Sequence, residues 1–472
     1  MPIPTLIILS FTLFFLWKEY NFRAFLHPAT IFHVIWILSA ISYLIVVNLM
    51  ERQIVILFID EYFVNELLTF VCFTSIAVSI NVYFSKGRMK SRIVQWRYPL
   101  VINDLIRILI LVIFVVSFAR VLLVGSLNVV QIRNAFGEET DRLMGGGLIG
   151  VGAFLINLIL IFNQPLLTYS GYALSRLAKE KYFSNDRKLK KNIILLYLPI
   201  ISGLFNAFLT GGRSAFLRVF ILFAIGYALA LFQREDLKLK KFRRGIVYLV
   251  LFFLLFSFYS TFIDESRRYA GNPNYVSDYA SYPLLKPFSG IINYLVCHYP
   301  GYCLDRKYVV TEAPEFGRWT LQGITHLEIP FLSQLLFPIS INSLINGSGQ
   351  FEVSKRDMGN YAGWIRTTST VFLLIYDDYG YFFSFIIIFL FVSISQYLFI
   401  RLFSKKSTRF LSIFPYTIFY LLWVNSIFTH HLTGNWLTNI FLCYLVFDWI
   451  SHKKKHTSMR AFKPLRRSSE NI

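Results

Sequence analysis

The stretch FSFIIIFLFVSISQYLFI, residues 383 to 400, contains no charged residue and is long enough to cross a bilayer as a helix. Comparable apolar stretches occur at residues 67 to 84, 151 to 169 and 410 to 428. Across the chain, 56% of the residues are hydrophobic and only 15% are charged, which is too little charged surface to cover a soluble globule of 472 residues. The sequence therefore predicts an all-α polytopic membrane protein.

Apolar stretches of spanning length predict about eleven transmembrane helices. The first stretch lacks a basic leader and a small-residue cleavage site, so we expect a retained helix and not a signal peptide. The expected spans are residues 3–17, 29–48, 64–84, 101–124, 148–173, 192–210, 214–232, 245–263, 383–400, 410–428 and 435–451. The expected units are residues 1–263 with about eight helices, a large loop at 264–382, residues 383–451 with about three helices, and a basic tail at 452–472.

The formal charge of +21 would suit a nucleic-acid-binding protein, but the positions of the basic residues indicate membrane topology instead. Cytoplasmic loops of membrane proteins are enriched in Lys and Arg. Most of the 47 lysines and arginines fall in one alternating set of loops, at 18–28, 85–97, 174–191, 233–244, 401–409 and 452–472. We therefore expect a cytoplasmic C-terminus, an outer N-terminus, the large loop on the outer side, and no nucleic-acid partner.

A short turn between two expected spans, Leu209-Thr-Gly-Gly-Arg-Ser-Ala-Phe216, has features of an anion site. Its glycines allow a tight reversal and leave backbone N–H groups uncovered at the positive end of the next helix, where Arg213 adds a full charge. Arg218 lies about 7 Å deeper by helical rise. The turn therefore suits a phosphate or pyrophosphate group. The plainer alternative is that Arg213 only caps the turn and contacts lipid headgroups.

The large loop contains most of the basic residues expected on the outer side. It opens with Asp264, Glu265, Arg267 and Arg268, and Arg366 lies near its end. The planar guanidinium group of arginine can chelate phosphate oxygens while it stays charged. The alternative is a solvated surface of ion pairs, such as Asp264 with Arg267 or Arg268.

Within this loop, two apolar runs are too short or too broken to span, at residues 329–345 and 371–382, and we expect both to be interfacial helices. The second run contains Asp377 and Asp378, two adjacent carboxylates that are costly near a membrane unless they are paired, hydrated or functional. One of them is a candidate general base or partner for an arginine, and a metal site is the weaker reading. His298 is a second candidate base, with a structural role as its alternative.

The four cysteines do not form a disulfide framework. Cys72 and Cys443 lie in apolar stretches, whereas Cys297 and Cys303 lie in the large loop. The latter pair could close one small ring on the outer side of the membrane, and two free thiols are an equal alternative.

The topology and two motifs resemble the oligosaccharide repeat-unit polymerases, the Wzy or O-antigen polymerase family, which is similar in plan to the O-antigen ligases and is GT-C-like. Thr210-Gly-Gly-Arg-Ser-Ala215 resembles the Thr-x-(Ser/Gly)-Arg-(Gly/Ser)-Ala turn of those enzymes. Residues 368 to 380, ending in Tyr376-Asp-Asp-Tyr-Gly380, resemble the segment after their large periplasmic loop. The ligases have a His-Asn pair near the start of this segment, where this chain has Thr and Ser, which favours a polymerase and leaves the general base unassigned.

This resemblance implies a bacterial inner-membrane glycosyltransferase that needs no metal and no cofactor. Two undecaprenyl-pyrophosphate glycans would meet at the periplasmic face, where a hydroxyl of one attacks the anomeric carbon of the other and undecaprenyl pyrophosphate leaves. Cations would stabilise the charge that develops on the leaving group. The expected pyrophosphate-binding residues are Arg213, Arg267, Arg268, Arg366 and Arg218, and the expected catalytic residues are Arg213, Asp264, Glu265, Asp378 and His298.

The expected partners are the donor and acceptor glycans and the lipid bilayer, and a chain-length regulator is left open. The alternatives are a transporter or flippase of the same lipid-linked glycans, an O-antigen ligase, and a membrane O-acyltransferase. The sequence has no Walker loop, Rossmann glycine fingerprint or zinc-ligand spacing, which favours a lipid-borne activated donor.

Overall fold

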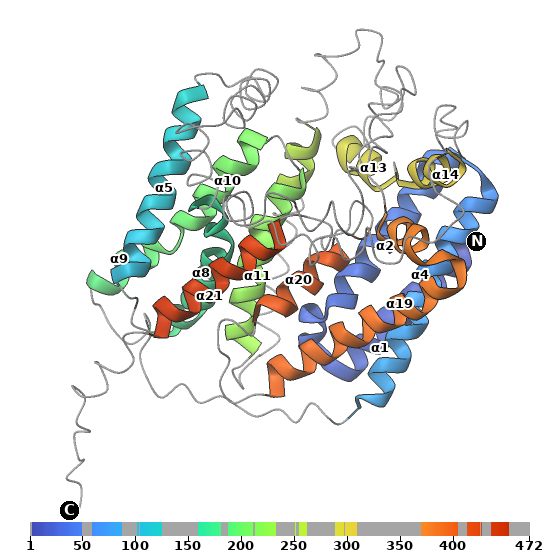
Figure 1. Cartoon of the computed structure of the whole chain (residues 1–472), viewed down its shortest axis with the longest axis horizontal. Helices are drawn as coiled ribbons and strands as arrows, with labels where there is room; N and C mark the ends of the chain where they lie inside the picture. Colours follow the sequence, from blue (N-terminus) through green and yellow to red (C-terminus); the bar gives the residue numbers. More distant parts are fainter. Residues whose placement is uncertain are drawn as a thin grey trace, which may run out of the picture.

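The computed structural model describes residues 2–49, 59–86, 102, 104–124, 159–180, 187–210, 213–232, 251, 254–261, 288–296, 298–308, 370–404, 413–424, 426 and 436–452. Every regular element in these ranges is a helix, as the sequence predicts (Figure 1). The elements are α1 Pro2–Tyr20, the 3-10 helix η1 Asn21–Leu26, α2 Pro28–Leu44, the π-helix η2 Ile45–Leu49, α4 Glu61–Phe84, α5 Asp104–Val124, α8 Asn163–Glu180, α9 Arg187–Leu195, α10 Leu198–Thr210, α11 Arg213–Phe232, α13 Ser289–Val296, α14 His298–Tyr308, α19 Val371–Ser404, α20 Ile413–Val424 and α21 Trp436–His452.

Seven helical segments in the described ranges are long and apolar enough to cross a membrane, which agrees with a multi-pass membrane protein. They are Pro2–Leu26, Pro28–Val47, Glu61–Phe84, Asp104–Leu122, Lys190–Leu209, Ala215–Phe232 and Val371–Phe403. The larger number of about eleven spans stays a prediction.

Helix α8, Asn163–Glu180, differs from the expected span at residues 148–173, because it continues past residue 173 to Glu180. Beyond residue 173 the side chains of Leu174 and Leu177 are still buried, and they pack in the same hydrophobic cluster as Ile106 of α5. Packing therefore extends this helix into residues that the sequence assigned to the basic loop at 174–191.

Helix α1 shows why these helices need a bilayer. Ile3, Ile7, Phe11 and Phe14 are all exposed, and their spacing of three to four residues places them on one face. Contiguous apolar faces of this kind are rare on soluble monomers. Lipid chains would cover them.

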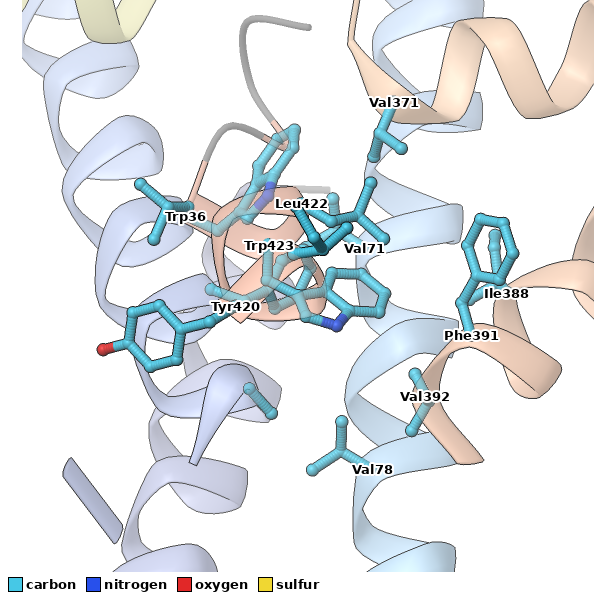
Figure 2. Close-up of a cluster of buried hydrophobic side chains, with 14 of the residues drawn as sticks. Trp36, Val71, Val78, Val371, Ile388, Phe391, Val392, Tyr420, Leu422 and Trp423 are labelled. Carbon is cyan, nitrogen blue, oxygen red and sulfur yellow. The ribbon is translucent and has the colours of Figure 1, made fainter. Parts of the chain in front are cut away.

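One hydrophobic cluster joins α2, α4, α19 and α20. Figure 2 shows Leu422 and Trp423 of α20 lying between α2 and α4, with Ile388 of α19 to one side. The Trp423 indole N–H donates to Ser395 Oγ on α19 at 2.8 Å, so this buried aromatic residue also has its polar atom paired.

Helices α8 and α11 cross at very close range. A Cβ added to Gly171 would lie 2.1 Å from the carbonyl oxygen of Phe223, and one added to Gly226 would lie 1.8 Å from that of Thr168. Both positions require glycine, because the backbones themselves are in contact, as in other small-residue helix crossings within membranes.

The helices bring two groups of residues to opposite ends of the bundle. Helices α13 and α14 lie together (Figure 1, upper right), beside the beginnings of α4 and α19, and we call this the α14 end. The His27 end contains η1, His27 and the ends of α1 and α4. Which end faces the cytoplasm stays a prediction.

Candidate functional site

Helix α19 is bent at Gly380, whose backbone has φ 69° and ψ 176°. This combination is almost restricted to glycine, so Gly380 divides α19 into two helices. Ser384 Oγ lies 2.6 Å from the carbonyl oxygen of Gly380 and 3.2 Å from that of Ile375, so its single hydroxyl proton is donated to one of them or shared between the two. The first part, residues 371–379, is called the acidic arm because it contains Asp377 and Asp378. The sequence predicts a short helix over 371–382, and the structure ends it at the bend.

The acidic arm is anchored at its beginning. Val371 N–H donates to the carbonyl of Ser426 at 3.0 Å, and the Thr370 hydroxyl accepts from Leu373 N–H at 3.2 Å as a helix N-cap. The Asp377 and Asp378 residues are 7% and 0% exposed. The arm is therefore packed into the bundle and keeps its two carboxyl groups away from bulk solvent.

Glu66 of α4 binds two residues of helix α14. Arg306 donates from Nε to Oε1 at 2.7 Å and from Nη2 to Oε2 at 3.1 Å, and the Tyr302 hydroxyl donates to Oε1 at 2.7 Å. The exposed fractions of the Glu66 and Arg306 side chains are only 6% and 12%. A carboxylate buried to this degree is tolerated because both of its oxygens are bonded in a fork-like geometry.

Arg306 also contacts the acidic arm. Its guanidinium carbon lies 3.7 Å from the ring centroid of Tyr376, a cation–π contact, and 5.3 Å from that of Phe63. Burial alone would lower the pKa of Arg306, but the bonded carboxylate of Glu66 outweighs it, and the pKa rises above its usual value. The arginine therefore stays charged and joins α14, α4 and the acidic arm.

His298, the first residue of α14, is 0% exposed. Its Nε2 lies 3.2 Å from Ser39 Oγ, its ring packs edge-on against Trp36 at 5.0 Å, and its Nδ1 has no hydrogen-bond partner in the described part of the chain. Burial lowers the pKa of His298 to about 3. A histidine with this pKa is a weak base at neutral pH, and its packing favours the structural alternative that the sequence left open.

His298 and the acidic arm share one neighbour. Trp36 contacts the His298 ring on one side and Phe372 of the arm at 5.7 Å on another, and its indole N–H donates to Ser426 Oγ at 3.0 Å. The fold therefore brings two of the predicted site segments, around His298 and around Asp378, to the same end of the bundle.

The other predicted residues are not brought to this cluster within the described ranges. Arg213 is the first residue of α11, with its side chain outside the described part, and Arg218 is half-buried one turn further along. Helix α11 packs mainly against α8 and α10, which carry none of the α14-end residues. The remaining predicted site residues lie outside the described residues, namely Asp264, Glu265, Arg267, Arg268 and Arg366.

Cys303 is a free thiol whose Sγ donates to the carbonyl of Asp60 at 3.6 Å, and Cys297, the other member of the predicted pair, lies outside the described residues. Burial raises the pKa of Cys303 to about 11, so the thiol is unreactive at neutral pH. Among the residues that the structure describes, there is no group of three His, Cys, Asp or Glu side chains that could hold a metal ion.

Three members of the α14-end cluster, Glu66, Tyr302 and Arg306, were not expected from sequence as site residues. One signal was present, because Glu66 is a carboxylate inside an expected span, and such residues are usually paired or functional. Its partners could not be identified, because they lie more than two hundred residues away in a loop with many other basic residues.

No family model matches the chain, and no curated protein or solved structure matches it either. The geometry of the cluster itself therefore indicates what it can do. The α14 end places a paired arginine against the Tyr376 ring, next in sequence to Asp377 and Asp378, and this contact is suited to hold the acidic arm in one position.

Proposed function

We propose that the protein joins lipid-linked oligosaccharide repeat units into a surface polysaccharide, as a polymerase that resembles the Wzy family. The observation that carries the proposal is that Arg213 begins α11, an apolar helix of 20 residues. The first turn of such a helix offers unbonded N–H groups and a positive dipole, and the arginine adds a full charge. This combination supports a diphosphate that is attached to a membrane lipid.

In this proposal, the reaction is a displacement at the anomeric carbon of the donor glycan. A hydroxyl of the acceptor forms the new glycosidic bond, the bond to the pyrophosphate oxygen breaks, and the proton passes to a base. Arg213, with the other proposed arginines Arg218, Arg267, Arg268 and Arg366, would stabilise the leaving pyrophosphate. A carboxylate is the favoured base, and Asp264, Glu265, Asp377 and Asp378 are the candidates.

Surface glycan from cells that lack the protein tests this function. A polymerase defect removes the long ladder on a gel and leaves a single repeat unit attached to the lipid acceptor. Loss of every repeat unit would instead indicate a flippase or a ligase and would contradict the proposal.

The Arg213→Ala substitution tests the site itself. We expect loss of the ladder at normal protein level, because the pyrophosphate loses its principal cation. Lys190→Ala, on the exposed surface of α9, is the matched control and should leave the ladder intact. A normal ladder in the Arg213→Ala cells would remove this residue from the site.

A further inference from the structure

We propose that Glu66 and Arg306 are positioning residues: their ion pair holds the acidic arm, residues 371–379, in the place that the reaction requires. The inference deepens the proposed function and rests on it for the reaction, but the position of the arm can be measured independently. Neither residue needs to touch the substrate for this role.

The charge of Arg306 is already neutralised by Glu66. Two of its nitrogens bond both oxygens of Glu66, at 2.7 and 3.1 Å, and the face of its guanidinium group covers the Tyr376 ring. An incoming pyrophosphate would have to compete with a carboxylate that is bound in a bidentate manner. Arg306 is therefore better suited to hold protein groups than to bind the substrate, unlike the other arginines proposed above.

Both residues of α14 that bond Glu66 lie on one face of the helix. Tyr302 and Arg306 are four residues apart, and residues with this spacing lie above one another on a helix. Burial and the neighbouring carboxylate raise the pKa of Tyr302 well above its usual range, so its hydroxyl remains a donor to Glu66. The docking of α14 on α4 is therefore directional and not merely apolar.

The position of the acidic arm depends on contacts near both of its ends. Gly380 interrupts the helix between the arm and the long part of α19, so the helical backbone is not continuous through the bend, and Ser384 Oγ contacts the Ile375 carbonyl across it. Its beginning is held by the Val371 bond to Ser426. Near its other end, the Tyr376 contact with Arg306 is adjacent in sequence to Asp377 and Asp378. Release of the ion pair would thus allow the carboxylates to move.

Glu66→Gln is the primary test, because it keeps the size and one acceptor oxygen while it removes the charge that holds Arg306. We expect hydrogen exchange of the arm amides to become at least about tenfold faster. In membranes supplied with lipid-linked repeat units, we expect the apparent kcat to fall at least about tenfold with KM within about twofold, because a displaced arm affects the reaction more than substrate binding. Glu61→Gln, at an exposed position on the same helix, is the matched control.

Two further sets of variants keep the test decisive if Glu66→Gln folds poorly. Arg306→Lys keeps a cation beside Glu66 and the Tyr376 ring, and it should keep slow exchange and activity if this charge is what holds the arm. Tyr376→Phe keeps the aromatic face and should behave as wild type, whereas Tyr376→Leu should resemble Glu66→Gln.

The possible outcomes separate this inference from the proposed function. Unchanged exchange of the arm in Glu66→Gln would overturn the inference whatever reaction the protein performs. Fast exchange with normal polymerisation would overturn the positioning role, and an Arg306→Lys variant that keeps slow exchange without activity would show that Arg306 is itself a ligand, which also overturns it. If the wild type makes no polymer, the proposed function fails while the exchange result still decides whether the pair holds the arm.

Discussion

The two ends of the bundle both contain a buried polar cluster that joins α4 to α19, but only one cluster contains charged residues. At the α14 end, Arg306 pairs with Glu66 and stacks on Tyr376 of the acidic arm. At the His27 end, the joining groups are an imidazole, an amide and two hydroxyls. The same pair of helices is therefore held by ionic chemistry at one end and by neutral hydrogen bonds at the other.

The neutral network is closed on itself. His27 Nδ1 accepts from Ala29 N–H at 3.1 Å, which leaves its Nε2–H to donate to Gln396 Oε1 at 2.5 Å. The amide nitrogen of Gln396 then donates to the Tyr20 hydroxyl at 2.5 Å and to Ser85 Oγ at 2.6 Å. Because each polar group has its partner, this end is well suited to rigidity and offers little free chemistry.

The charged cluster differs because half of it comes from a short helix. Arg306 and Tyr302 belong to α14, which has 11 residues, whereas Glu66 belongs to α4, one of the seven helical segments long and apolar enough to cross a membrane. The pairing of Glu66 therefore depends on the docking of α14 on α4. The buried charge of Glu66 thus links α14 to α4. The neutral network at the His27 end makes no such link to α14.

The largest effect on the charged cluster is expected from Arg306→Ala, which would leave the Glu66 carboxylate buried without its cation. We expect the free energy of unfolding to fall by about 3 to 5 kcal/mol, as measured by SDS titration of the purified protein in mixed micelles. The double variant Glu66→Leu with Arg306→Leu removes both charges and should lose only about 1 to 2 kcal/mol, because the Tyr302 hydroxyl loses its acceptor. A loss below about 1 kcal/mol for Arg306→Ala would show that the pair is not buried as described.

The pH dependence of stability tests the burial of His298 at the α14 end, where this residue is in its neutral form. Its pKa of about 3 lies below the ordinary value of 6.5, so its contribution is fully present above pH 6.5 and is lost as the pH falls toward 3. Between pH 8 and pH 5 we expect a loss of about 2 kcal/mol from this residue. The same titration with His298→Gln should show a correspondingly shallower dependence, and identical slopes would contradict the assignment.

The smallest effect is expected at the neutral end. Gln396→Leu removes the acceptor of the His27 N–H, while Tyr20 and Ser85 can still bond one another at 3.2 Å. One stranded buried donor costs about 1 to 2 kcal/mol in the free energy of unfolding, measured in the same SDS titration. The arm amides should keep their slow exchange in this variant. Faster exchange there would mean that the two ends are coupled and would weaken the contrast.

The helical structure of the acidic arm could be predicted from the sequence, but its contact with Arg306 could not. The run 371–382 predicts a short helix because it is apolar but too short to span, and the structure has a helix there as far as residue 379. The bend at Gly380 explains where it stops. The contact with Arg306 has no sequence signal, because many basic residues of the loop are equally suited to pair with a carboxylate.

Sequence alone determined that the chain is helical and belongs in a membrane, because apolar runs of spanning length need a bilayer and satisfy their backbone only as helices. It also identified His298 and the Asp377–Asp378 pair as candidate site residues. Only the tertiary structure decided that Glu66 binds Arg306 and that His298 is sealed against Trp36. Hydrophobic periodicity is a local property of the chain, whereas the pairing of buried polar groups depends on which distant segments the packing brings together.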